Sequence, residues 1–90
     1  MTTVESFLLC GSANGVGLRD LAALTGTDTR TVRKMIQYER LHGAPILSDN
    51  KNGYFLPDSD AERVACVRSL RRRAAEILRV ADALEGAVYA

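Results

Sequence analysis

Basic and amide side chains recur at intervals of three and four residues within one short stretch, at Arg30, Arg33, Lys34 and Gln37. This spacing places them together on one face of a helix. Arginine and glutamine can form paired hydrogen bonds with the edges of bases, and arginine and lysine attract phosphates. We therefore expect this face to contact double-stranded DNA in the major groove.

Three further side chains can extend this surface. Thr29 and Thr31, at the start of the same helix, carry hydroxyls that can hydrogen-bond to the DNA backbone. Tyr38 falls between the polar and apolar sides of the helix, where its ring can pack and its hydroxyl can reach a phosphate.

A helix-turn-helix pattern over residues 21–35 positions this surface. We expect a first helix over about 18–25 and a turn at Gly26-Thr27, because glycine readily adopts the left-handed conformation between packed helices. The small side chain of Ala22 suits the point where the two helices touch. The buried residues of the first helix are expected to be Leu18, Leu21, Ala22 and Leu24.

The second helix carries the basic residues on the side opposite its apolar residues. Thr27 or Asp28 is expected to cap its start, and it runs to about His42, which caps carbonyls before Gly43. The apolar side consists of Val32, Met35 and Ile36.

A β-hairpin is predicted to follow. Residues 44–48 and 54–57 have strand composition, and Asn52-Gly53 between them is a hairpin-turn signal because both residues tolerate positive φ. Asn50 and Lys51 at its tip are expected to contact the neighbouring groove or backbone of DNA. Lys51 can equally well be a surface lysine that keeps the loop soluble and contacts no phosphate.

An additional helix is expected at the N-terminus, from Thr2 or Thr3 to Gly11, with Val4, Phe7, Leu8 and Cys10 at core spacing. In the glycine-rich link that follows, Val16 can add one short strand rung.

A long helix over about 59–86 closes the chain. Ser59 and Glu62 have capping-box spacing at its start. Apolar or small residues then recur every three or four positions, as expected for a coiled-coil seam that forms a homodimer. They are Val67, Leu70, Ala74, Ile77, Ala81, Leu84 and Val88.

Two alternatives to the homodimer stay open. The helix can fold back against Phe7 and Leu8 of its own domain, or it can bind a different partner. In an antiparallel self-pair, Arg71 could meet Glu85 of the second copy. The run Arg71-Arg72-Arg73 is typical of a solvated helix face, and it can also serve as an accessory patch for DNA.

Composition narrows the function classes. The 90 residues have a net charge of +1, so the distribution of charge matters more than its sum. Residues 63–79 contain six arginines and one glutamate. No transmembrane span or signal peptide is expected, and Cys10 and Cys66 are interpreted as buried thiols in a reducing cytoplasm. One histidine and no matched nucleophile and base argue against an enzyme, and no metal or cofactor site is expected.

The order of elements resembles that of a winged helix. The residues Leu21-Ala22, Gly26, Val32-Arg33, Pro45-Ile46 and Gly53-Tyr54-Phe55-Leu56 resemble the N-terminal domain of biotin-repressor-type regulators and the winged domains of phages and mobile elements. The resemblance implies a mainly α fold with a β-hairpin wing at residues 1–57. It does not reach the segment 58–90, which we expect to be a dimerisation helix. We expect no counterpart of the large effector domain of the full-length regulators, so the resemblance implies no ligand sensing.

The expected function is sequence-specific binding of double-stranded DNA by a homodimer that regulates transcription. The alternative is a module that holds a protein complex together and binds no nucleic acid.

Overall fold

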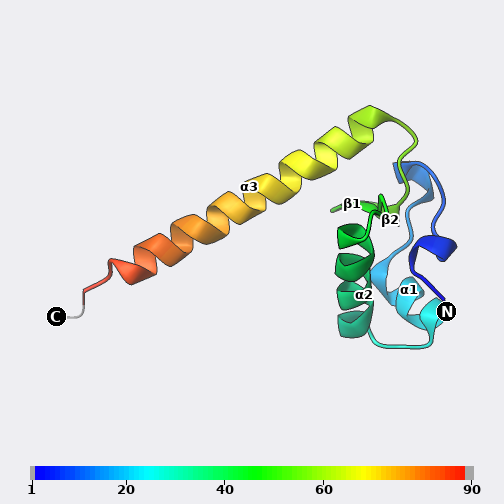
Figure 1. The fold of residues 1–90 in the computed structure, drawn as a ribbon, viewed down its shortest axis with the longest axis horizontal. Coiled ribbons are helices and arrows are strands. Elements are labelled where there is room, and N and C mark those ends of the chain that lie inside the picture. The colour runs from blue at the N-terminus through cyan, green and yellow to red at the C-terminus, as the bar shows by residue number, and fades with distance from the viewer. Residues whose placement is uncertain (1, 89–90) are drawn as a thin grey trace.

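The computed structural model describes residues 2–88, which form an elongated molecule of 52 × 31 × 24 Å (Figure 1). This part of the chain is mainly helical, with one two-stranded antiparallel hairpin and a long C-terminal helix. The elements are η1 (Glu5–Phe7), η2 (Ser12–Asn14), α1 (Leu18–Thr25), α2 (Thr29–Leu41), β1 (Leu47–Asp49), β2 (Gly53–Phe55) and α3 (Asp60–Glu85).

The predicted pair of helices is confirmed, with α1 and α2 joined by a tight turn. Gly26 has φ 70° and ψ 28°, the left-handed conformation that ends α1. Asp28 caps α2, because its side chain accepts a hydrogen bond from the backbone N–H of Thr31 at 2.7 Å. His42 follows the last residue of α2, as expected, and its Nδ1 lies 2.8 Å from the carbonyl oxygen of Tyr38.

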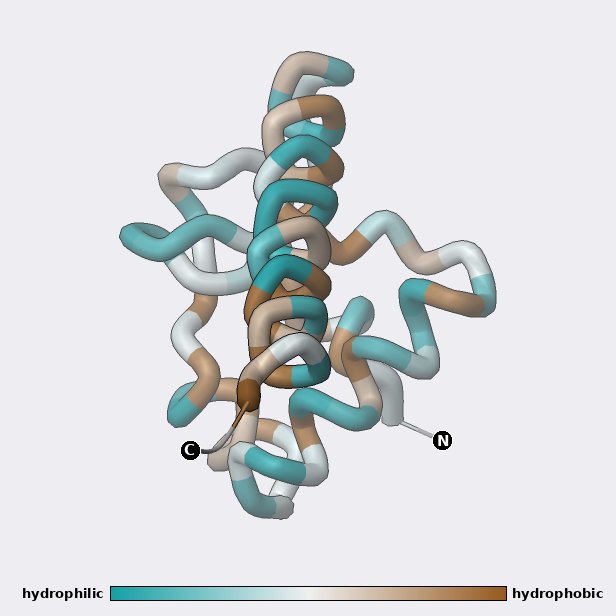
Figure 2. Tube along the Cα trace, turned by 90° about the vertical axis from the view of Figure 1, so that its left-hand side faces the viewer, coloured by the Kyte–Doolittle hydropathy of each residue, from teal (hydrophilic) through white to brown (hydrophobic). Residues whose placement is uncertain are grey.

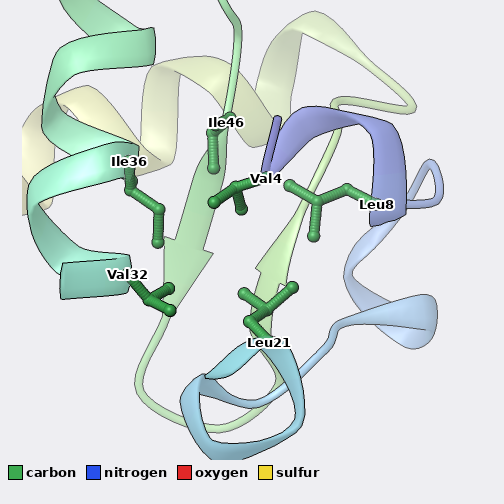
Figure 3. Packing of buried hydrophobic residues seen from close by; sticks show 6 residues of the cluster. All are labelled: Val4, Leu8, Leu21, Val32, Ile36 and Ile46. Carbon is green, nitrogen blue, oxygen red and sulfur yellow. The ribbon is translucent and has the colours of Figure 1, made fainter. Parts of the chain in front are cut away.

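One apolar core joins these helices to the N-terminal segment and to the residue before β1. Its side chains point toward one another in Figure 3, and the charged residues stay outside it. Met35, Leu18 and Ala22 pack at its edge and are half-buried. Leu24 is 52% exposed, so the prediction that it is buried was wrong. The core consists of Val4, Leu8, Leu21, Val32, Ile36 and Ile46.

The hairpin forms where it was predicted, with shorter strands. Leu47 pairs with Phe55 and Asp49 with Gly53. Of the two residues of the turn signal, Gly53 alone uses positive φ, at 86°, since no residue other than glycine has positive φ in residues 2–88. The carboxylate of Asp49 holds the turn instead, by accepting the side-chain amide of Asn52 at 2.9 Å. The predicted rung at Val16 is confirmed as an antiparallel bridge to Tyr54.

The N-terminal helix predicted from Thr2 or Thr3 to Gly11 is wrong, because only the single 3₁₀ turn η1 forms there. The chain beyond η1 is extended and pairs with the residue after β2. The N–H of Leu56 donates to the carbonyl of Leu9, and the N–H of Gly11 donates to the carbonyl of Leu56, both at 2.8 Å. Cys10, expected to be buried, is exposed in this extended segment. Long-range backbone pairing therefore overrides the local helical pattern.

Two glutamates fasten the N-terminal segment to the helices. In α2, the carboxylate of Glu39 accepts the backbone N–H groups of Val4 at 2.8 Å and Glu5 at 2.9 Å. In α3, Glu62 accepts the N–H of Ser12 at 2.9 Å. These contacts satisfy backbone N–H groups at the starts of η1 and η2, where a helical turn supplies no acceptor of its own.

The long helix α3 touches the hairpin near its start and then extends beyond the rest of the molecule (Figure 1). Cys66 is buried against Leu47 and Phe55, as predicted for this thiol. Every residue of α3 after Cys66 is exposed. The alternative in which this helix folds back on Phe7 and Leu8 is therefore wrong, because those side chains pack against the core described above.

Candidate nucleic-acid interface

The basic face of α2, defined as Arg30, Arg33, Lys34 and Gln37, is exposed along its length. Val32 and Ile36 anchor the opposite side of the helix in the core (Figure 3). The core thus fixes the rotation of α2 about its axis, and with it the direction in which the basic face points. This direction is the one that the sequence predicted.

The long side chains of the basic face have no partners within residues 2–88. No hydrogen bond or ion pair involves the side chains of Arg30, Arg33, Lys34 or Gln37 in this part of the chain, whereas Arg63 and Arg79 pair with Asp60 and Glu76. A phosphate or a base edge could therefore be contacted without breaking an existing contact. Such a surface keeps its charge available for a polyanion.

The N-terminus of α2 is not free to bind an anion through its backbone N–H groups, because the side chain of Asp28 already lies there. Thr31 is exposed and Thr29 is half-buried. Asp28 places a carboxylate beside the first turn, and hydrogen bonds from the side chain and the N–H of Thr31 lower the pKa of Asp28 below its usual 3.8. The capping carboxylate occupies the N–H that a phosphate would otherwise bind. The hydroxyl of Thr29 and the basic face remain the available phosphate-binding groups at this end.

Tyr38 lies on the flank of the basic face and is 63% exposed. Its ring stacks on that of His42 with the centroids 4.1 Å apart. Thr31, Lys34 and Tyr38 share the wall of one open depression of about 410 Å³, together with Thr2 and Thr3 of the N-terminal segment. The structure thus brings three of the predicted contact residues together on one flank.

Two charged residues of α2 have structural roles that the sequence did not reveal. Glu39 binds the N-terminal segment, as described above. The Nε of Arg40 donates to the carbonyl of Ile46 at 2.7 Å, and its guanidinium lies 6.0 Å from the centroid of the Tyr54 ring. Both residues lie toward the apolar side of α2. Their position on the helix is therefore the feature of the sequence that could have distinguished them from the residues of the basic face.

The tip of the hairpin is exposed at Asn50 and Lys51. Asn50 lines a crevice with Ser69 and Arg73 of α3, so the hairpin tip lies beside α3. Within residues 2–88, no hydrogen bond joins Asn50 or Lys51 to α2. Arg73 of α3 thus adds a second positive charge, besides that of Lys51, near the tip of the hairpin.

The residues predicted for dimerisation lie on α3 and are exposed. Leu70 borders the crevice beside the hairpin, whereas Ile77 is 68% and Leu84 71% exposed beyond it. Val88 lies past the end of the helix. The remaining exposed members of the predicted set are Val67, Ala74 and Ala81.

Two kinds of feature are absent from residues 2–88, a membrane-spanning helix and a cluster of metal ligands. No helix there combines enough length with enough apolar character to cross a membrane. In the same range, no group of three or more histidine, cysteine, aspartate or glutamate side chains is arranged to hold a metal ion.

Comparison with known proteins adds no relative, since no family model, no curated protein and no solved structure matches this chain.

Proposed function

We propose that this chain is a winged helix-turn-helix protein that binds double-stranded DNA through the basic face of α2. The observation that carries the proposal is the exposed, unpaired state of Arg30, Arg33 and Lys34 in residues 2–88, on a helix held from behind by Val32 and Ile36. The α1-turn-α2 pair followed by a hairpin is compatible with this fold.

In the proposed complex, α2 lies in the major groove. Arginine and glutamine of the basic face contact base edges, and Lys34 contacts phosphates. Thr29, Thr31 and Tyr38 bind the DNA backbone beside it, and Asn50 and Lys51 contact the adjacent groove. A protein of this kind regulates transcription or assembles a nucleoprotein complex in the cytoplasm of a bacterium.

The proposal is tested by fluorescence anisotropy with a labelled random-sequence duplex at low and moderate salt. Four phosphate contacts would lower the affinity by about 100-fold between about 50 and 200 mM salt, because each contact releases a counterion. Absence of binding at the lower salt concentration would overturn the proposal. Lys51→Ala should reduce the salt slope by about one unit if the hairpin tip contacts a phosphate.

A second candidate, a protein-interaction module, is favoured by one feature of the same surface. Leu41 lies at the C-terminal end of the exposed side of α2 and is 77% exposed, next to the half-apolar ring of Tyr38. Aromatic and apolar side chains at the centre of a patch, with polar residues around them, are typical of protein interfaces. Such a module would show no binding to the duplex at either salt concentration.

A further inference from the structure

The C-terminal helix α3 carries an apolar stripe that nothing covers in residues 2–88. We call this stripe the apolar seam. It begins beside the hairpin, where Cys66 packs on Leu47 and Phe55 and Leu70 borders a crevice, and all of its members are exposed to solvent. Hydrophobic and hydrophilic residues alternate along this helix in Figure 2. The apolar seam consists of Val67, Leu70, Ala74, Ile77, Ala81 and Leu84.

The charges of α3 are segregated along its length. The part just beyond the hairpin carries only positive charge, from Arg68, Arg71, Arg72 and Arg73. The last ten residues contain Glu76, Asp82 and Glu85 and a single arginine, Arg79, whose guanidinium binds Glu76 at 2.9 Å. Asp82 and Glu85 have no ion pair in the described part of the chain.

The position of these acids is unfavourable for an isolated helix. The C-terminus of a helix carries partial negative charge, and the last turn of α3 contains no basic residue. A positive charge supplied from outside would relieve this repulsion. The arginine-rich half of a second α3 supplies such charge.

We propose that α3 pairs with the α3 of a second copy of this chain in antiparallel orientation. A parallel pair would bring the two arginine-rich halves together, whereas the antiparallel pair places each beside the acidic half of the other copy. Arg71, Leu78 and Glu85 are seven residues apart and share one flank of the apolar seam, so Arg71 meets Glu85 of the second copy. Ala74 and Ala81 present single methyl groups, which allows the two helices to approach closely.

The antiparallel pair is related by a twofold axis across α3, so it carries the two α1-α2 bodies at opposite ends. A helix of this length spans about 39 Å. If the proposed DNA binding is correct, the dimer therefore presents two symmetry-related basic faces. The pairing itself does not depend on DNA.

Sedimentation equilibrium of the full chain without DNA tests the pairing. The unchanged protein is expected to be a dimer, and Glu85→Arg or Arg71→Glu alone should weaken it by about 10-fold or more. An equimolar mixture of the two variants should recover a heterodimer, because both ends of the antiparallel pair then join opposite charges, whereas each variant paired with itself joins like charges at both ends. Asp20→Arg, an exposed acid on α1, is the matched control and should leave the dimer unchanged.

Cysteine cross-linking tests the orientation in a Cys10→Ser background. Leu70→Cys mixed with Leu84→Cys should form a disulfide between the two variants, and neither should cross-link efficiently with itself. Self-linking of Leu70→Cys would show a parallel pair and overturn the proposal. A monomeric unchanged protein at about 100 µM would overturn it as well. Circular dichroism establishes that each variant is folded. If the protein is a monomer that still binds duplex DNA, the pairing of α3 is contradicted but the proposed DNA binding is not.

Discussion

The carboxylate of Glu62, in the first turn of α3, accepts a hydrogen bond from the backbone N–H of Ser12 at 2.9 Å, across 50 residues of sequence. Its second oxygen accepts the N–H of Asp58 at 2.8 Å. Ser59 caps the helix by accepting the N–H of Glu62 at 3.3 Å, which confirms one half of the predicted capping box. One side chain thus ties the start of α3 to the N-terminal segment, just before Cys66 packs on the hairpin.

The hydrogen bonds of Glu62 make the stability of the folded protein depend on pH. The N–H groups of Asp58 and Ser12 hold the pKa of Glu62 below its usual 4.5. Because the pKa is lower in the folded than in the unfolded state, the stabilisation is complete above pH 4.5 and is lost as the pH falls through the folded value.

Glu62→Gln should therefore lower the Tm at neutral pH and reduce the further loss of Tm on acidification. Thermal melts of both proteins between about pH 7 and pH 3 measure this difference. Asp28 and Asp49, whose pKa values are also lowered, retain their own acid dependence in the variant. Parallel curves of Tm against pH for the two proteins would contradict the assigned role of Glu62.

Two glycines with positive φ should differ in their tolerance of alanine. A Cβ on Gly53 would lie 2.5 Å from the carbonyl oxygen of Val16, whereas a Cβ on Gly26 would have no neighbour within 4 Å. Gly26→Ala should cost about 1–2 kcal/mol from backbone strain alone. Gly53→Ala should cost at least about 1 kcal/mol more, because the bridge between Val16 and Tyr54 must also shift.

Urea denaturation of the two glycine variants gives this comparison directly. An equal loss of free energy of unfolding in both would contradict the close packing of the hairpin on Val16.

Arg40→Ala separates a structural arginine from the basic face on the same helix. It removes the hydrogen bonds to the carbonyl of Ile46 at 2.7 Å and to the hydroxyl of Ser48 at 3.2 Å. The free energy of unfolding should fall by about 1–3 kcal/mol, because a half-buried acceptor loses its partner. Affinity for DNA, measured at a temperature where the variant is fully folded, should stay unchanged. A large loss of affinity in that folded protein would place Arg40 in the interface.

The two thiols should react at different rates. Cys10 is exposed, whereas Cys66 is buried between the hairpin and α3. A coloured thiol reagent added to the native protein should modify one cysteine rapidly and the second only as the contact opens. Cys10→Ser should remove the fast phase alone. Two fast phases would show that α3 does not stay packed on the hairpin.

The sequence was sufficient to predict those parts of the fold in which several local signals agree. The bounds of α1, the turn at Gly26, the cap at Asp28 and the side of α2 that is buried depend on residues close in the chain. The exposed state of the basic face follows from the same helical spacing. These features could be predicted because packing and capping agree with the local pattern.

The sequence was insufficient where distant contacts decide. Helical spacing placed Cys10 on the side of Phe7, but pairing with Leu56 keeps that segment extended. The carboxylates of Glu39 and Glu62 bind backbone N–H groups of the N-terminal segment across 35 and 50 residues of sequence. No local pattern encodes such contacts. The direction in which α3 leaves the hairpin has the same origin, since it depends on the packing of Cys66.

The most direct test of the account compares two exposed arginines in duplex binding. Arg33 belongs to the basic face, whereas Arg79 is ion-paired with Glu76 on α3. A duplex selected from random sequence by the unchanged protein serves as the probe. Arg33→Ala should weaken binding by about 1–3 kcal/mol, whereas Arg79→Ala, which removes the same charge, should change it little. Equal affinities for the two variants would contradict the claim that α2 contacts DNA.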